Sequence, residues 1–206
     1  MSRQILVIAT RNSGKLFELC ELLRDLPFTL RDLNCFPSIE PVAETGVTFA
    51  ENASMKARAY AQQTQFMTLA DDSGLEVTAL GGAPGVRSAR YAGDEASDAQ
   101  RTNKLLAELS KRSSADRTAQ FVSAVAIANT AGLILNVSIG VCDGRIAHVP
   151  RGQNGFGYDP VFIPSGYDQT FGELSAELKN EISHRARALQ GTLNFLRSLT
   201  RASGDG

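Results

Sequence analysis

Two adjacent carboxylates, Asp71 and Asp72, directly follow an apolar run that predicts a strand over residues 66–70. Neighbouring side chains of an extended chain point to opposite faces, so we expect only one of the two to face a given site. Mg²⁺ takes carboxylate and phosphate oxygens and keeps several waters, so one or two carboxylates suffice to hold it. Glu44 or Glu40, in the preceding loop, could complete such a site. The alternative is a turn in which Asp-Asp-Ser-Gly caps nearby amides.

A polar loop over residues 10–15 follows an apolar run at 4–9, which predicts a buried strand, and precedes a helical pattern. Its Asn12, Gly14 and Lys15 supply backbone amides, a permissive glycine and a cation, a combination that suits phosphate at a helix N-terminus. The loop does not match the G-x-x-x-x-G-K-[ST] pattern, and by itself such a turn is more often only a helix cap. It is a candidate phosphate site that needs support from other segments.

The segment Gly155–Pro160 combines two glycines, two aromatic side chains and a carboxylate. This composition suits a wall that stacks on a purine and accepts a hydrogen bond from its ring. For Phe156 and Tyr158 the alternative is an aromatic anchor that packs the loop on the core. His184 and Arg185 stand at the predicted start of the last helix, where they would place donors at a helix N-terminus. Their alternative is a pair of solvated surface side chains.

The length and the predicted elements fit one α/β domain, which could be bilobed. Besides the strands at 4–9 and 66–70 and the helix after residue 15, the sequence predicts a helix from a capping box at Thr48 and Glu51, extended structure over 75–80, a helix from Asp98, a hairpin of 118–128 and 133–141, a strand over 145–149 and a helix over 183–199. A charged, serine-rich loop precedes Arg117, and residues 202–206 are expected to fray.

The composition is that of an ordinary globular protein, with 43% hydrophobic and 21% charged residues. A net charge of -1 creates no global field, so neither nucleic acid nor an acidic membrane is an expected partner. The cysteines, Cys20, Cys35 and Cys142, suggest neither a disulfide framework nor a Cys-x-x-Cys metal site. The first apolar run is too short for a signal peptide, and no stretch approaches a transmembrane span. We therefore expect a cytoplasmic protein.

Several separated segments together resemble the inosine triphosphate pyrophosphatase family, of the bacterial type called dITP/XTP pyrophosphatase or Ham1-like. The matching segments are Ala9–Lys15, Glu44–Gly46 with Phe49 and Glu51–Ala53, Lys56–Ala57, Ala70–Leu75, Gly81–Tyr91, Gly155–Pro160 and Ser183–Arg185. They cover essentially the whole chain, and several motifs in the right order are far more specific than any one of them.

The resemblance implies a single domain over residues 1–206 with an α/β fold, an elongated mixed β-sheet flanked by helices in two lobes with a central substrate cleft. It also implies a homodimer. The implied activity is Mg²⁺-dependent hydrolysis of ITP, dITP and XTP to the monophosphate and pyrophosphate, which cleanses the nucleotide pool.

The resemblance further implies a role for each matching residue. Asp72 is implied as a metal ligand and as the general base for the attacking water, with Glu44 as the second metal ligand. Lys56 is implied as a catalytic cation that reaches the phosphates, and Ser73 as a substrate contact. Binding roles are implied for Thr10, Arg11, Asn12, Ser13, Gly14 and Lys15 at the triphosphate, and for Phe156, Gly157, Tyr158, Asp159, Lys179, His184 and Arg185 around the base and its sugar.

Two positions depart from the family's pattern. Arg11 stands where members often carry Gly, which leaves its role open. Ala43 and Glu44 stand where two carboxylates are frequent, which leaves Glu40 as the other candidate for the second metal ligand.

The chemistry of the base limits how a pocket can select it. Hypoxanthine and xanthine carry an oxygen at C6, whereas adenine carries an amino group, so a donor at O6 rejects ATP. His184 and Arg185 are our candidates for that donor, and Asp159 for an acceptor at the far edge of the base.

Two other functions fit part of the pattern. A Maf-like nucleotide pyrophosphatase acts on pyrimidine or modified nucleotides, and the paired segments Gly155–Pro160 and Ser183–Arg185 argue against it. A nucleotide sensor that binds without turnover needs no base for a water, so Asp72 and Lys56 argue against a sensor. A substrate panel separates the first alternative, and release of pyrophosphate from ITP excludes the second.

Overall fold

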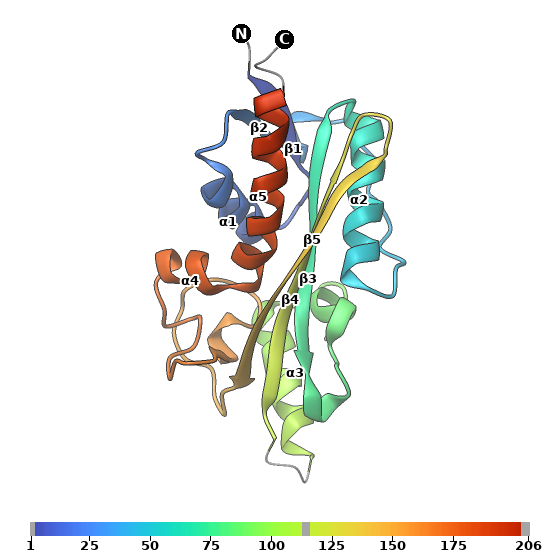
Figure 1. Cartoon of the computed structure of the whole chain (residues 1–206). Helices are drawn as coiled ribbons and strands as arrows, with labels where there is room; N and C mark the ends of the chain where they lie inside the picture. The colour runs from blue at the N-terminus through green and yellow to red at the C-terminus, as the bar shows by residue number, and fades with distance from the viewer. Residues whose placement is uncertain (1–2, 113–115, 203–206) are drawn as a thin grey trace. The chain divides into compact units, whose positions relative to one another are not determined.

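The computed structural model describes residues 3–112 and 116–202. Its elements are β1 (Gln4–Ile8), α1 (Ser13–Leu23), β2 (Phe28–Asp32), the 3-10 helix η1 (Leu33–Cys35), α2 (Phe49–Thr64), β3 (Met67–Val77), η2 (Thr78–Leu80), η3 (Gly85–Arg90), α3 (Asp98–Ser110), β4 (Thr118–Ala128), β5 (Ile134–Ile146), η4 (Asp159–Val161), β6 (Phe162–Pro164), α4 (Ala176–Ile182) and α5 (His184–Ala202) (Figure 1). Within these residues a six-stranded sheet has the order β2-β1-β3-β4-β5-β6. β1 is parallel to β2 and β3, whereas β5 and β6 are antiparallel. The expected α/β fold with a mixed sheet is confirmed.

The chain divides into two compact units. Unit 1 comprises the residues up to Asp72, Ser123–Gly140 and the residues from Arg185 onward, and unit 2 comprises Ser73–Val122 and Val141–His184. The strands β3, β4 and β5 each contribute residues to both units. A central substrate cleft and the assignment of the whole chain to a single domain stay predictions.

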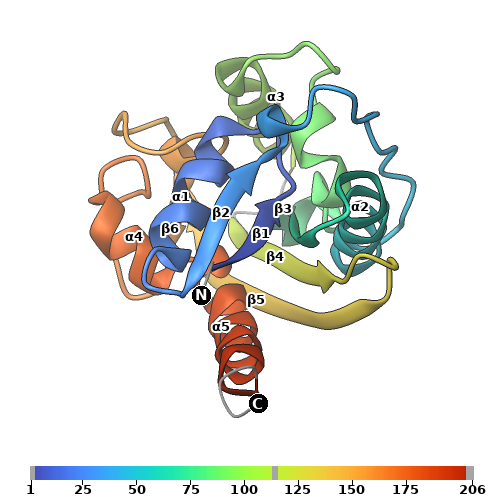
Figure 2. The same ribbon diagram turned by 90° about the horizontal axis from the view of Figure 1, so that it is seen from above.

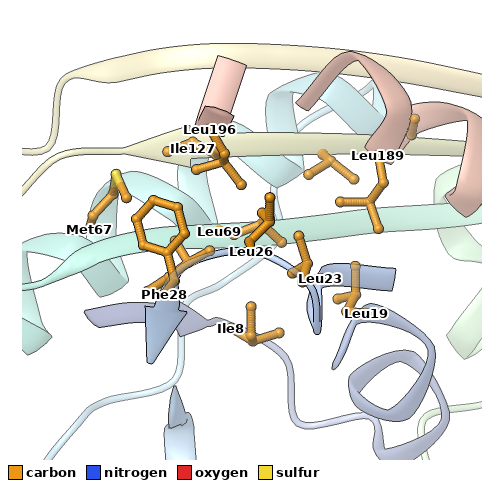
Figure 3. Packing of buried hydrophobic residues seen from close by; sticks show 13 residues of the cluster. Ile8, Leu19, Leu23, Leu26, Phe28, Met67, Leu69, Ile127, Leu189 and Leu196 are labelled. Atoms are coloured by element: carbon orange, nitrogen blue, oxygen red, sulfur yellow. The ribbon is translucent and has the colours of Figure 1, made fainter. Parts of the chain in front are cut away.

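The core of unit 1 is an aliphatic cluster between helices and sheet. Leu19 and Leu23 of α1 and Leu189 and Leu196 of α5 pack with Ile8 of β1 (Figure 3). The leucines recur at intervals of four and seven, so each helix turns one apolar stripe toward the sheet. Burial of each such side chain contributes about 1.5–3 kcal/mol to folding. This cluster holds α1 and α5 on one face of the strands.

The alternation of side chains along β3 distinguishes its two faces. Met67 and Leu69 join the cluster beneath α1 and α5, whereas the hydroxyl of Thr68 lies 3.5 Å from that of Thr64 in α2. Figure 2 shows α1 and α2 on opposite sides of β1 and β3. Odd-numbered residues of this part of β3 therefore face α1 and α5, and even-numbered residues face α2.

Small side chains bring α2 close to the sheet. Ala53, Ala57 and Ala61 are spaced by four residues, and none is exposed to solvent. The helix begins at the expected capping box, in which Oγ1 of Thr48 accepts from the amide of Glu51 and the Glu51 carboxylate accepts from the amide of Thr48. The alanines allow the helix to pack close to the sheet, and the capping box determines where the helix begins.

Aromatic side chains build the core of unit 2. Phe121 of β4 lies 4.5 Å from Phe162 between ring centroids, and Phe162 lies 5.3 Å from Phe171. Leu105 and Leu109 of α3 pack into the same cluster. The expected helix from Asp98 therefore covers this core with its apolar stripe.

The Asp-Asp-Ser-Gly segment is not a turn. β3 continues without interruption from Met67 through Asp71 and Asp72 to Val77, so the prediction that the strand ends before Asp71 is wrong. Gly74 and Leu75 are buried within the strand. The tertiary structure supplies charged partners for both carboxylates, and these partners make burial of the acidic pair possible.

Two further predictions differ from the structure. The expected strand over 145–149 does not form by itself, because Arg145 and Ile146 complete β5 and the chain then leaves the sheet. Extended structure over 75–80 stops at Val77 and becomes η2. The short helix α4 was not expected, and the serine-rich stretch at 113–115 and the tail after Ala202 lie outside the described residues. No helix in the described part of the chain is long and apolar enough to cross a membrane.

Candidate active site

The register of β3 sends Asp71 and Asp72 to opposite faces of the sheet. Asp71 follows Leu69 onto the face of α1 and α5, and Asp72 follows Thr68 and Ala70 onto the face of α2. Both carboxylates are nearly inaccessible to solvent. The two carboxylates have different charged partners, in agreement with the expectation that only one of them faces a given site.

On the α2 face a lysine joins two carboxylates. Nζ of Lys56 lies 3.2 Å from Oδ1 of Asp72 and 2.9 Å from Oε1 of Glu44. Oδ2 of Asp72 is buried and has no hydrogen-bond partner among the described residues. The two carboxylates thus share one ammonium, and Oδ2 of Asp72 remains as a possible ligand for a metal ion.

The loop that carries Glu44 is tied to the first turn of α2. The buried amide oxygen of Asn52 accepts a hydrogen bond of 2.8 Å from the amide of Gly46. A Cβ atom at Gly46 would lie 2.7 Å from that oxygen and 2.8 Å from Cβ of Glu51, so only glycine allows this approach. The contact between Gly46 and Asn52 therefore holds the loop close to the start of α2, two residues after Glu44.

Glu40 lies apart from this group. Its amide donates to Oε1 of Gln63 at 2.7 Å, and its carbonyl oxygen accepts from Nε2 of the same side chain. Gln63 is seven residues beyond Lys56 on α2, about 10 Å along the helix axis. Of the two candidates, Glu44 is the one that the structure brings to the ion pair of Asp72.

Burial and charge act in opposite directions on the α2 face. Burial would lower the pKa of Lys56, but the carboxylates of Asp72 and Glu44 outweigh it and raise that pKa above its usual value. Burial raises the pKa of Asp72 and is only partly offset by Lys56 and Lys15. Lys56 therefore stays charged, whereas Asp72 is a stronger base than an ordinary aspartate.

On the opposite face Asp71 is fully buried at the centre of a second network of charged side chains. Nζ of Lys15 lies 2.7 Å from Oδ1 of Asp71, and Oδ2 accepts from the hydroxyl of Ser123 at 2.8 Å and from Nε of Arg185 at 3.4 Å. The guanidinium of Arg185 also pairs with Glu18 of α1. This network joins α1, β3, β4 and α5 through charged side chains.

The charges of this network hold Asp71 ionised. Burial would raise its pKa, but Arg185 and Lys15 outweigh burial and hold the pKa well below its usual range. Burial lowers the pKa of Lys15, and the charge of Asp71 opposes this effect. Asp71 is therefore an anion at neutral pH and pairs with two cations.

The polar loop at 10–15 is both a helix cap and an array of amides. Oδ1 of Asn12 accepts from the amide of Lys15 at 2.9 Å, and Oγ1 of Thr10 accepts from the amide of Asn12 at 3.2 Å. Ser13 and Gly14 form the start of α1, and Arg11 is exposed. The two roles that the sequence left open for this loop are compatible, because a capped helix N-terminus still directs its first amides outward.

In unit 2 the carboxylate of Asp159 organises the loop around Phe156. Its Oδ2 accepts from the amide of Phe156 at 2.8 Å and pairs with the ammonium of Lys179. That ammonium lies 4.8 Å from the centroid of the Phe156 ring, over its face. A Cβ at Gly155 would lie 1.9 Å from Oδ2 of Asp159, and Gly155 has a φ of +73°, so the loop requires glycine there. Asp159, the expected hydrogen-bond acceptor for the base, is thus buried and bonded within its own loop.

A hydrogen bond and an aromatic contact hold two other residues of the expected base pocket in place. Tyr158 is buried in the core of unit 2 and donates from its hydroxyl to the carbonyl oxygen of Ser88 at 2.9 Å, which is the anchoring role left open for it. The ring of His184 stacks on Phe121 with 4.6 Å between centroids. Ser73 follows Asp72 in β3 and is partly exposed. A contact of any of these side chains with a substrate stays a prediction.

Comparison with known proteins decides the family. The model of the Ham1 family matches residues 6–195. This chain belongs to the Ham1 family. It is 50% identical over 189 residues to a dITP/XTP pyrophosphatase of Syntrophobacter fumaroxidans, covering 92% of this chain and 80% of that protein. It is also 50% identical over 184 residues to a dITP/XTP pyrophosphatase of Geobacillus kaustophilus, covering 89% of this chain and 90% of that protein.

Solved structures of Ham1 proteins share the fold. The structure of a Ham1 protein from Coxiella burnetii superposes with a TM-score of 0.85 at 44% identity, covering 96% of this chain and 99% of that one. The Ham1 protein of Staphylococcus aureus gives a TM-score of 0.83 at 39% identity, covering 95% and 99% of the two chains. The expected membership is confirmed over nearly the full length of the chain.

The sequence analysis did not identify several residues that contact the predicted site residues. Glu18 lies three positions after Lys15 on α1, a spacing that places both on one helix face, and this was a usable signal. Ser123 carries no such signal, because a serine in an apolar strand gives no hint of a carboxylate partner across the sheet. Asn52 likewise shows its role only through the backbone of Gly46.

Proposed function

We propose that this chain hydrolyses non-canonical purine nucleoside triphosphates, such as ITP, dITP and XTP, to the nucleoside monophosphate and pyrophosphate, and so clears them from the nucleotide pool. The similarity to proteins called dITP/XTP pyrophosphatase supports this proposal. The observation that carries it is the group of Asp72, Lys56 and Glu44, in which one buried carboxylate oxygen has no hydrogen-bond partner among the described residues. The match to the Ham1 family favours this function over a Maf-like activity.

Asp72 and Glu44 fit Mg²⁺ as a cofactor. Both carboxylates lie against one ammonium, and the Oδ2 atom of Asp72 is available as a ligand. The described residues contain no cluster of three or more acidic, histidine or cysteine side chains, so phosphate oxygens and waters would complete the coordination, as is usual for Mg²⁺. When bound, the ion would neutralise phosphate charge and polarise the attacked phosphoryl group.

The side chains of unit 1 supply the remaining chemistry. Water attacks a phosphorus, a new P–O bond forms, and the P–O bond to the departing pyrophosphate breaks in line with it. Asp72 orients the water and accepts its proton, and the raised pKa of this carboxyl suits the task. Lys56 and Lys15 provide positive charge for the phosphates, and the residues of the 10–15 loop provide amides.

We also propose that the loop cluster of unit 2 binds the base. Phe156 offers a partly exposed ring whose position is held by Asp159 and Lys179. Of the two candidates for the donor to O6, His184 belongs to unit 2, whereas the guanidinium of Arg185 is buried against Asp71 and Glu18 in unit 1. The oxygen at C6 of hypoxanthine and xanthine, which adenine lacks, would then accept this hydrogen bond and select the substrate.

We propose a homodimer of single-domain chains that works in the cytoplasm. Val137 and Ile139 of β5 are exposed apolar side chains that a second copy would cover, and Val137 also lines a groove of about 620 Å³ along α2. Cys20, Cys35 and Cys142 are all free, as is usual in a reducing compartment.

A substrate panel tests the proposed activity. We expect pyrophosphate release from ITP, dITP and XTP, with ATP rejected by a factor of roughly 10⁴ in kcat/KM, because adenine leaves hydrogen-bonding groups unpaired. GTP shares O6 and N1–H with ITP, so we expect its rejection to be weaker than that of ATP. The measurement is pyrophosphate formed per unit time at several concentrations of each nucleotide with Mg²⁺. Binding of ITP without pyrophosphate release would instead indicate a sensor, and preference for pyrimidine nucleotides would restore the Maf-like function.

Removal of divalent cations tests the cofactor. We expect excess EDTA to abolish pyrophosphate release and added Mg²⁺ to restore it, because Asp72 and Glu44 are proposed to act on phosphates through the metal. Thermal melting of the EDTA-treated protein serves as the control for intact folding. Full activity in EDTA would show that the carboxylates act without a metal.

A further inference from the structure

The first turn of α3 holds the peptide group beside Phe156. The amide of Gly157 donates to Oδ2 of Asp98 at 2.7 Å, and the carbonyl oxygen of Gly157 lies 3.5 Å from the hydroxyl of Thr102, its donor. Asp98 and Thr102 are four residues apart and therefore share one face of the helix. Side chains of one helix thus form hydrogen bonds with both the amide and the carbonyl oxygen of Gly157.

Asp98 is itself held in place. It is the first residue of α3, directly after Ser97, whose capping box fixes where the helix begins. Its Oδ1 pairs with the guanidinium of Arg101, which also donates to the carbonyl oxygens of Ala89 at 2.9 Å and Ala96 at 2.6 Å. The acceptor that faces Gly157 is therefore a fixed part of unit 2.

The backbone around Phe156 is held on both sides as a result. Its own amide donates to Asp159, and the next amide, that of Gly157, donates to Asp98. Gly157 has a φ of +64°, a left-handed conformation in which the chain reverses direction just after the aromatic residue. These two anchored amides fix the backbone that carries Phe156, and the ammonium of Lys179 lies over one face of its ring.

We propose that Asp98, assisted by Thr102, is a positioning residue for base recognition. It fixes the orientation of the peptide group between Phe156 and Gly157. Through this peptide it positions the aromatic ring against which the purine is selected. This inference rests on the proposed function, because it assigns the loop of Phe156 to the base of that substrate.

Loss of Asp98 is expected to affect nucleotide binding and hydrolysis differently. The Asp98 carboxylate belongs to unit 2, whereas Asp72, Lys56 and Lys15 belong to unit 1 and handle the phosphates. Loss of Asp98 should therefore weaken nucleotide binding and selection of the base, while the hydrolytic step changes little. A residue that only stabilised the fold would leave KM and the ratio of substrates unchanged for the folded protein.

The test compares three variants with the wild-type protein. Asp98→Ala removes the acceptor, Asp98→Asn keeps an acceptor oxygen but removes the charge, and Glu95→Ala removes an exposed carboxylate that lies two residues before Ser97. For each variant, kcat and KM are measured with ITP, GTP and ATP. Inhibition of ITP hydrolysis by inorganic triphosphate, which has no base, is measured alongside. Thermal melting confirms that each variant is folded at the assay temperature.

We expect Asp98→Ala to raise KM for ITP roughly tenfold or more, as loss of the hydrogen-bond acceptor for the amide of Gly157 would, and to lower the ratio of ITP to GTP in kcat/KM. We expect kcat and inhibition by inorganic triphosphate to stay within about twofold of the wild-type values, since neither depends on the base. Asp98→Asn should recover most of the KM, and Glu95→Ala should match the wild-type protein.

Three outcomes would overturn the proposal. The first is an unchanged KM and ITP to GTP ratio in folded Asp98→Ala. The second is equal defects in Asp98→Asn and Asp98→Ala, which would assign the effect to the ion pair with Arg101. The third is weaker inhibition by inorganic triphosphate, which would place the effect at the phosphates. The proposed function fails separately, and only if the wild-type protein releases no pyrophosphate from ITP.

Discussion

Asp72→Asn is expected to lower kcat for ITP by about two or more orders of magnitude, because the change removes the proposed general base and a metal ligand together. Asparagine has nearly the same shape, so the packing of β3 against α2 is retained. Lys56 keeps its ion pair with Glu44 at 2.9 Å. The measurement is pyrophosphate release under saturating ITP and Mg²⁺. A near wild-type kcat would move the catalytic role to another residue, with Asp71 as the neighbouring carboxylate.

The same variant is expected to be at least as stable as the wild-type protein at neutral pH. Burial raises the pKa of Asp72 in the folded state, so the folded protein binds its proton more tightly than the unfolded chain does. Its contribution to stability therefore falls as pH rises from about 3.9, the ordinary value for Asp, through the folded-state pKa. Asparagine cannot ionise and removes that cost. A clear loss of stability in Asp72→Asn would show that its ion pair with Lys56 outweighs its burial.

Asp71→Asn, the same chemical change one residue earlier, is expected to lower the free energy of unfolding by about 3–5 kcal/mol, because it leaves buried cations without their shared anion. Lys15 and Arg185 lie 2.7 Å and 3.4 Å from the carboxylate of Asp71, which is fully buried. Urea unfolding followed by circular dichroism measures the loss, since the chain has no tryptophan. Asp72→Asn is the matched control, and equal stabilities of the two variants would contradict the division of roles.

The pH dependence of this difference has a definite sign. The folded-state pKa of Asp71 is held below its ordinary value despite burial, by Arg185 and Lys15. Its contribution to stability is therefore fully present above about pH 4 and is lost as pH falls through the folded-state pKa. The gap between the wild-type protein and Asp71→Asn should narrow as pH is lowered below about 4. A gap that stays constant there would show that the loss has another cause, such as altered packing.

Local patterns predicted most of the helices and strands of this Ham1 protein. The capping box at Thr48 and Glu51 marks the start of α2 because both partners lie within one turn of the chain. The leucines of α1 and α5 show which helix face is buried. Prediction failed at Asp71 and Asp72, where acidic residues in a strand interior are unfavourable unless cations from distant segments pair with them. Lys56 lies 16 residues before Asp72 in the sequence, and Arg185 lies 114 residues after Asp71, so neither pair can be recognised within one local segment.

The sequence by itself determined the α/β class, the Ham1-type motifs and the two-residue alternation that separates Asp71 from Asp72. These properties depend on side chains within a few residues of one another or on motif order, so they can be read along the chain. Only the tertiary structure decided which partner each carboxylate has. It placed Asp71 with Arg185, 114 residues later, and joined Asp72 to Glu44 through Lys56. Pairing of this kind depends on which helix covers which face of the sheet, and that choice is made by burial of the whole core rather than by any local pattern.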